Sequence, residues 1–380
     1  MNNGRCVEGS KGRREKINNS KNQGSLENER ICTVSGDRQS NVIVAPVDDY
    51  YLHENDDITV GRRYHKRLRD DLSMKLKKTG EVDVDYNLTE LKSKYEKHKP
   101  DIRPLDQGLD HIQDYIMKKS EEMKTTDLDK ILHGAQIVCS RRTLKLLALS
   151  PYSCKNWIFA IEEYNGILFL KELGKAESKE NICDSEYFGY IFEKLIFATP
   201  EELLDEKDVI STYEKMYVAT SVKLHTNTED KKIKKQEQTI NVFATASIDG
   251  LDRDGNYIEV KSGILSKGFS TLEWWLQSKF ASIENIIHGI KSEEVDLNFA
   301  YKWRTEIAFG AIHQIFSALI MKYGSFVKKL KDKRKLKHQP QIVMKIEKGS
   351  KEVLLEENQK STPILNSKFK ERFQESKKKK

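Results

Sequence analysis

Apolar and polar residues alternate in several short segments of the chain, which is the pattern of β-strands with one buried face. Two such segments, 157–161 and 167–170, flank a Tyr-Asn-Gly turn at 164–166 and predict a β-hairpin. A later pair of segments predicts a second hairpin across Gly349. The strands of this second hairpin are expected at 341–346 and 352–355, and four further strands at 211–225, 239–249, 257–262 and 285–290.

Helices are indicated by apolar residues that return every three or four positions. Between Pro104 and Lys119 this spacing is followed by Leu105, Leu109, Ile112 and Ile116. Three more helices are expected at 185–198, 268–283 and 305–330. Because strands and helices are mixed along one stretch, the sequence predicts an α/β (α+β) fold with a mixed β-sheet core flanked by helices. We expect this fold to form a single domain spanning 41–361.

The two ends of the chain differ in composition from the middle. Residues 1–40 are rich in Asn, Ser, Lys, Arg and Gly, and 362–380 end in a run of lysines, so we expect disordered basic tails at both ends. The formal net charge of +7 suits a polyanionic partner, as it suits many other basic proteins. No apolar run approaches the roughly 18 residues that span a bilayer, so we expect no membrane partner. The cysteines show no metal-ligand spacing, and we expect reduced thiols.

The stretch Thr239 to Gly263 places charged side chains on two neighbouring predicted strands. In the first strand, Ser247 and Asp249 fall on the same face because side chains alternate between faces. In the second, Glu259 and Lys261 share a face. A polar turn at 251–256 connects the two segments, so we expect an antiparallel pair that brings Asp249, Glu259 and Lys261 together.

An acidic residue on one strand followed by Glu-x-Lys on the next suits metal-dependent cleavage of phosphodiesters. Carboxylate oxygens are the ligands that Mg²⁺ or Mn²⁺ prefers, and the cation lowers the pKa of an attacking water. A neighbouring lysine can hold a phosphate oxygen. The same pattern also occurs on an ordinary solvated strand face, so the spacing alone leaves both interpretations open.

Other residues favour the metal site, although each has an ordinary alternative. Glu193 lies in the markedly apolar helix segment 189–197, where a carboxylate is costly to bury without a partner, but it could equally lie on the surface of the helix. Arg141 follows the apolar run 137–139 and suits phosphate binding, or it belongs to a basic loop at a helix start. Trp274 and Trp275 are more typical of a core than of a base-stacking platform.

Together these segments resemble, in chain order, the motifs of the DXO decapping exoribonuclease family. This family has a PD-(D/E)xK-like nuclease fold and includes the fungal partner protein of the nuclear 5′–3′ exoribonuclease, and the chain is similar to a divergent fungal-type member. The matching segments are Ile137 to Tyr152 with Arg141 as the motif arginine, Gly189 to Glu193, Ser247 to Asp249 in place of Glu-x-Asp, Glu259 to Lys261 as Glu-x-Lys, and Trp274 to Ser278.

The resemblance implies a mixed-sheet hydrolase that removes incomplete, unmethylated or NAD-type caps from RNA 5′ ends, often with 5′–3′ exoribonuclease activity on 5′-phosphorylated RNA. It implies Mg²⁺ or Mn²⁺ as cofactor and a 5′–3′ exoribonuclease as a candidate partner. It also favours a nuclear location, with the cytoplasm as the alternative. The residue roles that it implies are metal binding by Glu193, Asp249, Glu259 and the Val260 backbone carbonyl, scissile-phosphate contacts by Lys261 and Gln277, and an RNA contact by Arg141.

The chain departs from the family pattern at two places. Ser140 and Arg142 flank the motif arginine where the family usually has Trp and Gly, and Ser247 replaces the Glu of Glu-x-Asp. Serine is a weak, neutral ligand, so Ser247 is expected to reach a metal only through water. Two functions therefore stay open, a decapping nuclease and a catalytically weakened scaffold that binds RNA or stabilises an exonuclease. A DNA-cleaving relative is disfavoured because the arginine and Gly-Tyr motifs match the decapping family.

Overall fold

The structure of the chain is a computed structural model. It describes residues 27–79, 109–153, 155–173, 184–198, 202, 213–226, 239–262, 269–289, 303–335, 339–358 and 363–374. Leu105 and the other predicted helical residues before 109 lie outside this part of the chain, as do residues 1–26 of the first predicted tail and residues 362 and 375–380 of the second.

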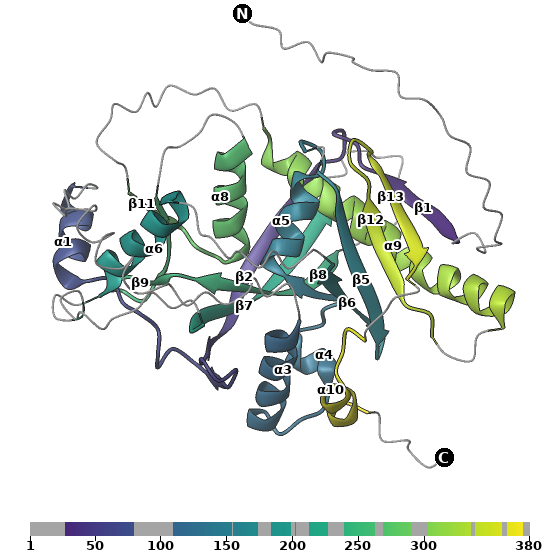
Figure 1. Cartoon of the computed structure of the whole chain (residues 1–380), viewed down its shortest axis with the longest axis horizontal. Coiled ribbons are helices and arrows are strands. Elements are labelled where there is room, and N and C mark those ends of the chain that lie inside the picture. The colour runs from purple at the N-terminus through teal and green to yellow at the C-terminus, as the bar shows by residue number, and fades with distance from the viewer. Residues whose placement is uncertain are drawn as a thin grey trace, which may run out of the picture.

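A ten-stranded mixed sheet runs through the centre of the molecule (Figure 1). Its strand order is β1-β13-β12-β5-β6-β4-β8-β7-β2-β3. Two neighbouring pairs in this sheet are parallel, β4 with β6 and β4 with β8. All its other pairs are antiparallel. The strands are β1 (Asn28–Thr33), β2 (Ser40–Leu52), β3 (Ile58–Val60), β4 (Ile137–Ser140), β5 (Trp157–Tyr164), β6 (Ile167–Glu172), β7 (Lys215–Thr226), β8 (Ile240–Ile248), β12 (Ile342–Ile346) and β13 (Glu352–Glu357).

Helices cover both faces of this sheet, because successive residues of its central strands are apolar and enter opposite cores. Ile137 and Val242 pack with α5 (Arg141–Leu149), α8 (Phe269–Phe280) and α9 (Thr305–Arg334). Their chain neighbours Val138 and Phe243 pack on the other face with α3 (Asp110–Glu122), α4 (Leu128–Ile131) and α10 (Ser367–Arg372). Figure 1 shows α5 and α8 above the centre of the sheet and α3, α4 and α10 below it. Among the described helices, none is both long and apolar enough to cross a membrane.

A second, three-stranded sheet lies beside the first and carries the Glu-x-Lys segment. It consists of β9 (Gly250–Leu251), β10 (Tyr257–Ser262) and β11 (Asn285–Gly289). β10 pairs in parallel with β11 and antiparallel with β9. The helices α6 (Asp184–Phe197) and α1 (Asp70–Thr79) lie at this end of the molecule (Figure 1). Leu72 of α1 and Ile196 of α6 pack with Ile258 and Val260 of β10.

Most of the predicted elements are confirmed. Both hairpins form, as β5–β6 and β12–β13, and α6, α8, α9 and β11 occupy the predicted segments. The mixed sheet flanked by helices is also confirmed. The prediction that the strands at 239–249 and 257–262 are adjacent and antiparallel was wrong for most of their length. The chain leaves the large sheet after Ile248, and only the two residues of β9 pair antiparallel with β10.

The predicted tail boundaries were also wrong. Residues 28–33 form β1, which pairs with β13 at the edge of the large sheet and buries Ile31. Residues 367–372 form α10, in which Phe369 is fully buried against the α3 side of the sheet. A few apolar residues in a polar segment suffice to bind it when a sheet edge supplies the backbone partners. The polar and basic composition of each predicted tail gave no indication that Ile31 and Phe369 would be buried.

Candidate active site

The candidate site lies where two parallel neighbours of the large sheet end. β4 and β8 pair in parallel, with Ser140 opposite Thr245, so the residues that follow each strand emerge at the same edge. After β4 the chain turns into α5, where the Ser140 side chain accepts a hydrogen bond of 3.3 Å from the Thr143 N–H and caps the helix. Arg141 is the first residue of α5, and its guanidinium reaches Ser247 and Glu259 at this edge.

Glu259 is the centre of the charged cluster. Only 2% of this residue is exposed, and both of its carboxylate oxygens are bound by cations. Arg141 Nη1 donates to Oε2 at 3.1 Å, and Lys261 Nζ donates to Oε1. Burial alone would raise the pKa of Glu259, but Arg141 and Lys261 outweigh it and hold the pKa below its usual value. In this state Glu259 is ionised and neutralised by the protein.

Asp249 lies next to Glu259 in a very different environment. Its Oδ2 accepts a hydrogen bond of 2.6 Å from the Val260 N–H, which fixes the carboxylate against β10. Burial raises the pKa of Asp249 well above its usual value, and the negative charges of Glu259 and Glu193 raise it further. The Val260 hydrogen bond and Lys261 act in the opposite direction without offsetting this. The positive charge around Asp249 is therefore too small to offset the unfavourable effect of burial and of the neighbouring acids on its ionised form.

Glu193 approaches the cluster from α6, and its side chain is partly buried, with 32% of it exposed. The close approach of α6 requires glycines, since a Cβ at Gly250 would lie 2.3 Å from Phe197 and one at Gly289 would lie 2.6 Å from Phe192. Burial raises the pKa of Glu193, Lys66 lowers it and Glu259 raises it again, with a net increase. Glu193 is thus close enough to the cluster for its charge to disfavour ionisation of Asp249, and for the charge of Glu259 to disfavour ionisation of Glu193.

Lys66 is a residue of this region that the sequence analysis missed. Its Nζ lies 3.9 Å from Glu193 Oε1, and its side chain is 50% exposed. It belongs to the segment 62–68, which we call the strap. The strap binds β9 through two backbone hydrogen bonds, from the Leu251 N–H to the Lys66 carbonyl and from the Leu68 N–H to the Leu251 carbonyl. No motif marks this segment, so only the fold brings it to the site.

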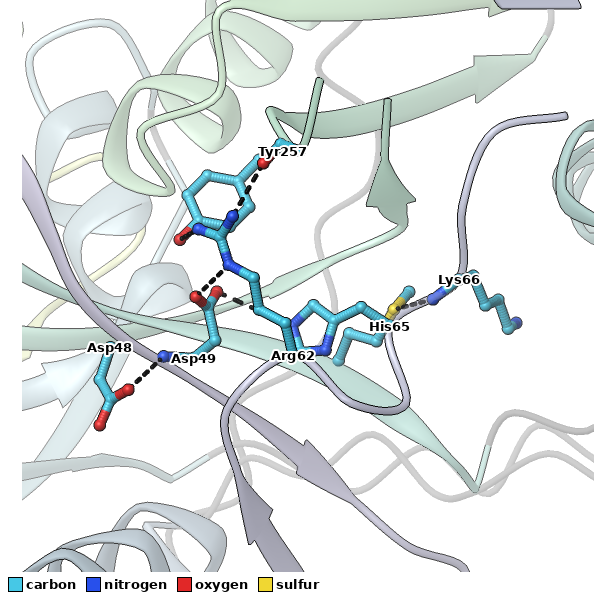
Figure 2. Close-up of polar contacts among 8 residues, drawn as sticks. Asp48, Asp49, Arg62, His65, Lys66 and Tyr257 are labelled. Carbon is cyan, nitrogen blue, oxygen red and sulfur yellow. Dashed lines mark hydrogen bonds and ion pairs between the residues drawn. The ribbon is translucent and has the colours of Figure 1, made fainter. Parts of the chain in front are cut away.

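Arg62 anchors the other end of the strap (Figure 2). Its guanidinium donates to Asp49 Oδ2 at 2.6 Å, to the Tyr257 hydroxyl at 2.8 Å and to the Gly255 carbonyl at 2.9 Å. Asp49 lies on β2 of the large sheet, whereas Tyr257 begins β10 of the small one. Figure 2 shows Arg62 between these two residues, with Lys66 extending away from them. Arg62 therefore connects the two sheets close to the strand that carries Glu259.

The remaining predicted residues lie at the border of the cluster. Ser247 Oγ accepts a hydrogen bond of 3.2 Å from Arg141 Nη2, so serine takes part in positioning the arginine. Gln277 on α8 contacts the cluster through its backbone carbonyl, which accepts a hydrogen bond of 3.3 Å from Arg141 Nη1. A phosphate contact by the Gln277 side chain stays a prediction. Trp275 packs against Trp303 and Phe309, as expected for a core residue.

The donor chemistry of the cluster fits a divalent cation, but its geometry is not that of a closed coordination shell. Among the residues that the structure describes, no three Asp, Glu, His or Cys side chains are already gathered around one point. Arg141 and Lys261 bind the two oxygens of Glu259, so a metal ion would have to compete with them for this carboxylate. Asp249 and Glu193, with pKa values raised by burial and by a neighbouring acid, are carboxylates that a bound cation would stabilise. Their roles as ligands, and that of the Val260 carbonyl, stay predictions.

A family model described as RAI1-like PD-(D/E)XK nuclease matches residues 51–370. The chain belongs to this family. The match covers the large sheet from the end of β2 onward, the strap, and every predicted site residue.

Individual relatives of this RAI1-like chain are distant. The decapping nuclease dom-3 of Caenorhabditis elegans is 28% identical over 182 residues, which are 44% of this chain and 46% of the nematode protein. The chain thus aligns with about half the length of this curated relative. Rai1 of Candida albicans, solved in complex with pU5-Mn²⁺, is 12% identical with a TM-score of 0.60, over 92% of this chain and 99% of that one. Rai1 of Scheffersomyces stipitis, solved with (3′-NADP)⁺ and calcium, is 12% identical with a TM-score of 0.58, over 92% and 98%. At these identities the structural matches establish the fold.

Proposed function

We propose that this chain is a divalent-metal-dependent hydrolase that removes incomplete, unmethylated or NAD-type caps from RNA 5′ ends and degrades 5′-phosphorylated RNA. The observation that carries the proposal is the cluster of Asp249, Glu259 and Glu193 with Arg141 and Lys261, in a chain of the RAI1-like nuclease family. The decapping nuclease dom-3 supports the reaction class. The Rai1 complexes with pU5-Mn²⁺ and with (3′-NADP)⁺ support RNA and dinucleotide caps as substrates.

In this proposal the carboxylates and the cations of the cluster serve different ligands. Asp249, Glu259 and Glu193 would hold Mg²⁺ or Mn²⁺, which supplies charge neutralisation and a more acidic bound water. Arg141 and Lys261 would bind the phosphate under attack, where their charges stabilise the oxygens that become more negative in the transition state. The Arg141 fork is aimed at this place by Ser247 and the Gln277 carbonyl.

The pairing of Glu259 suggests that RNA and metal assist each other in binding. A phosphate group competes with Glu259 for Arg141 and Lys261, and a cation competes with the same two residues for Glu259. Either ligand therefore weakens the contacts that oppose the other, and by linkage the effect is equal in both directions. We expect Mn²⁺ to bind more tightly in the presence of a non-hydrolysable RNA.

A second function is favoured by Ser247. Because serine replaces a metal-binding glutamate and Glu259 is neutralised within the protein, the chain could serve as an RNA-binding or exoribonuclease-stabilising scaffold. The two functions differ in whether capped RNA is cleaved at saturating metal.

The test is incubation with 5′-monophosphate, 5′-triphosphate, guanosine-capped and NAD-capped RNAs, with Mn²⁺ or with chelator, followed by identification of the released products. Metal-dependent release of an intact cap supports the hydrolase, and Glu259→Gln serves as the inactive control. RNA binding without any cleavage at up to millimolar Mn²⁺ would favour the scaffold.

A further inference from the structure

A second lysine on α5 has no role in the site described above. Lys145 lies one helical turn after Arg141, so the two side chains project from the same face of the helix. Lys145 is half-buried, and it forms no hydrogen bond or ion pair with any other residue in the described part of the chain. Lysine side chains on helices usually reach solvent with their ammonium groups, so this position requires an explanation.

The electrostatic environment of Lys145 is predominantly positive. The charged groups that act on it most strongly are one acid, Glu273, and three cations, Arg142, Arg141 and Lys261. Burial lowers the pKa of Lys145, Glu273 opposes the decrease, and the three cations add to it. The free protein therefore keeps an ammonium group where both solvent access and neighbouring charges disfavour it.

The helix α5 packs against α8, and Lys145 interacts with the charge of Glu273 on α8 as Arg141 contacts Gln277. Arg141 donates to the carbonyl of Gln277, and Glu273 lies one turn before Gln277 on α8. Lys145 therefore extends the row of positive charge that Arg141 and Lys261 begin, away from the carboxylates and along α8. Arg142 does not continue this row, because it is bound to Glu172 at 2.6 Å.

We propose that Lys145 binds a phosphate group of the 5′-terminal nucleotides of RNA, next to the phosphate that Arg141 and Lys261 hold. This inference rests on the proposed function for the identity of the ligand. The ligand class follows from the charges, because a compact ammonium group among three other cations provides an attractive position for an anion. A single-stranded RNA carries consecutive phosphates that can occupy adjacent positions along such a row.

The test measures binding without hydrolysis. The probes are 5′-phosphorylated uridine as the mononucleotide and as a five-nucleotide RNA, each titrated in chelator at several salt concentrations. We expect Lys145→Met to weaken binding of the five-nucleotide RNA about 5- to 10-fold at low salt and to reduce its salt slope by about 0.7, the value for one lost phosphate contact on a single strand. Lys145→Arg should retain most of the affinity, and Glu273→Gln, which removes the competing acid, should tighten binding.

The matched control is Lys118→Met, which removes an exposed lysine from α3 on the opposite face of the sheet. Its affinity and salt slope should equal those of the wild type. Weaker binding of both probes by Lys145→Met would place Lys145 at the terminal phosphate, and weaker binding of the longer probe alone would place it at the next phosphate. Unchanged binding of both probes would overturn the proposal.

Thermal melts separate binding from a structural role. If Lys145 only joins α5 to α8 through Glu273, then Lys145→Met and Glu273→Gln should both lower the melting temperature, and Lys145→Arg should not restore binding; that result would also overturn the proposal. If Lys145 is an anion site, Lys145→Met should melt no lower than the wild type. Since these measurements use no metal, they remain informative even if the chain proves unable to hydrolyse RNA.

Discussion

Asp49 is buried and Asp249 is partly buried in the same structure, yet their environments have opposite effects on their pKa values. Burial would raise the pKa of Asp49, but the neighbouring side chains of His65, Arg62 and Tyr257 lower it below its usual value. Burial raises the pKa of Asp249 well above its usual value, and the nearby Glu259 and Glu193 raise it further. Asp49 is 7% exposed, so the difference does not come from access to solvent alone.

The difference separates a structural carboxylate from a functional one. Asp49 finds its positive partner, Arg62, within the protein, and the pair connects β2 to the β10 segment (Figure 2). Asp249 receives one hydrogen bond, from the Val260 N–H, and is surrounded by other acids. An acid that the fold leaves in such an unfavourable state is a candidate for ligand binding, whereas an acid that already forms an ion pair within the protein is a weaker candidate.

The largest expected effect is on catalysis. Asp249→Asn should reduce metal-dependent hydrolysis at least about 100-fold, since it removes a charge that a divalent cation requires and several kcal/mol of transition-state stabilisation depend on that cation. Asp49→Asn should keep the activity of the folded fraction within a few-fold of the wild type. Initial rates on one capped RNA at saturating Mn²⁺ provide the measurement. Equal loss of activity in both variants would remove the distinction drawn between the two residues.

The second prediction concerns stability and reverses the order of the two variants. Asp49→Asn should lower the free energy of unfolding by about 2 kcal/mol at pH 7.5, because it leaves Arg62 without its partner; the partial exposure of Arg62 keeps the loss below that of a fully buried pair. In chelator, Asp249→Asn should be as stable as the wild type or more stable, because it removes an acid whose charged form is disfavoured by burial and by Glu259 and Glu193.

The pH dependence of the Asp49 effect has a definite sign. Since the folded-state pKa of Asp49 is depressed, its contribution is fully present above the unfolded value of about 3.9 and is lost as the pH falls through the folded value. Urea unfolding of wild type and Asp49→Asn should therefore differ by the same amount at pH 7.5 and 5.5, and by less at pH 3. A difference that grows as the pH falls would contradict this account.

Elements with a regular apolar spacing could be predicted from the sequence, whereas the environments of the charged residues could not. Period-two and helical spacing located the hairpins and α6, α8 and α9, because each of these elements buries one apolar face. The spacing of Asp249, Glu259 and Lys261 located the cluster, since two of them share one strand and the third directly precedes the short strand that pairs with it. Their environments could not be predicted, because the pKa of each depends on partners distant in the chain.

Residues outside any motif could be found only in the fold. Lys66 reaches Glu193 across more than a hundred positions of the chain, and Arg62 reaches Tyr257 in the same way. The short β9 was missed for a related reason, since a two-residue strand has no period of its own. β1 and α10 were mistaken for parts of tails because their few apolar residues are stabilised by β13 and by α3, far away in sequence.

A third prediction tests the neutral residue at the border of the cluster. Ser247→Glu should offer Arg141 a second carboxylate beside Glu259 and add negative charge close to Asp249. The Mn²⁺ concentration for half-maximal rate should fall about 10-fold, equivalent to about 1.4 kcal/mol. Ser247→Gln is the matched control, because it has nearly the same shape without the charge. A lower melting temperature with no gain in metal affinity would favour the scaffold function over a weakened enzyme.

The smallest expected effect is at Lys66, the cation nearest to Glu193 among the ion pairs of the described residues. At 3.9 Å and with half of its side chain exposed, Lys66 is well solvated, so its interaction with Glu193 is worth only about 0.5 kcal/mol. Lys66→Met should leave the melting temperature nearly unchanged. It should tighten Mn²⁺ binding about 2- to 3-fold, because Glu193 loses a competing cation and stays available to the metal.

Lys66→Arg keeps the charge and should match the wild type. Isothermal titration with Mn²⁺ in the absence of RNA gives the affinities directly. A marked weakening of Mn²⁺ binding by Lys66→Met would mean instead that Lys66 holds Glu193 in the position the metal needs, and that the strap is a required part of the site.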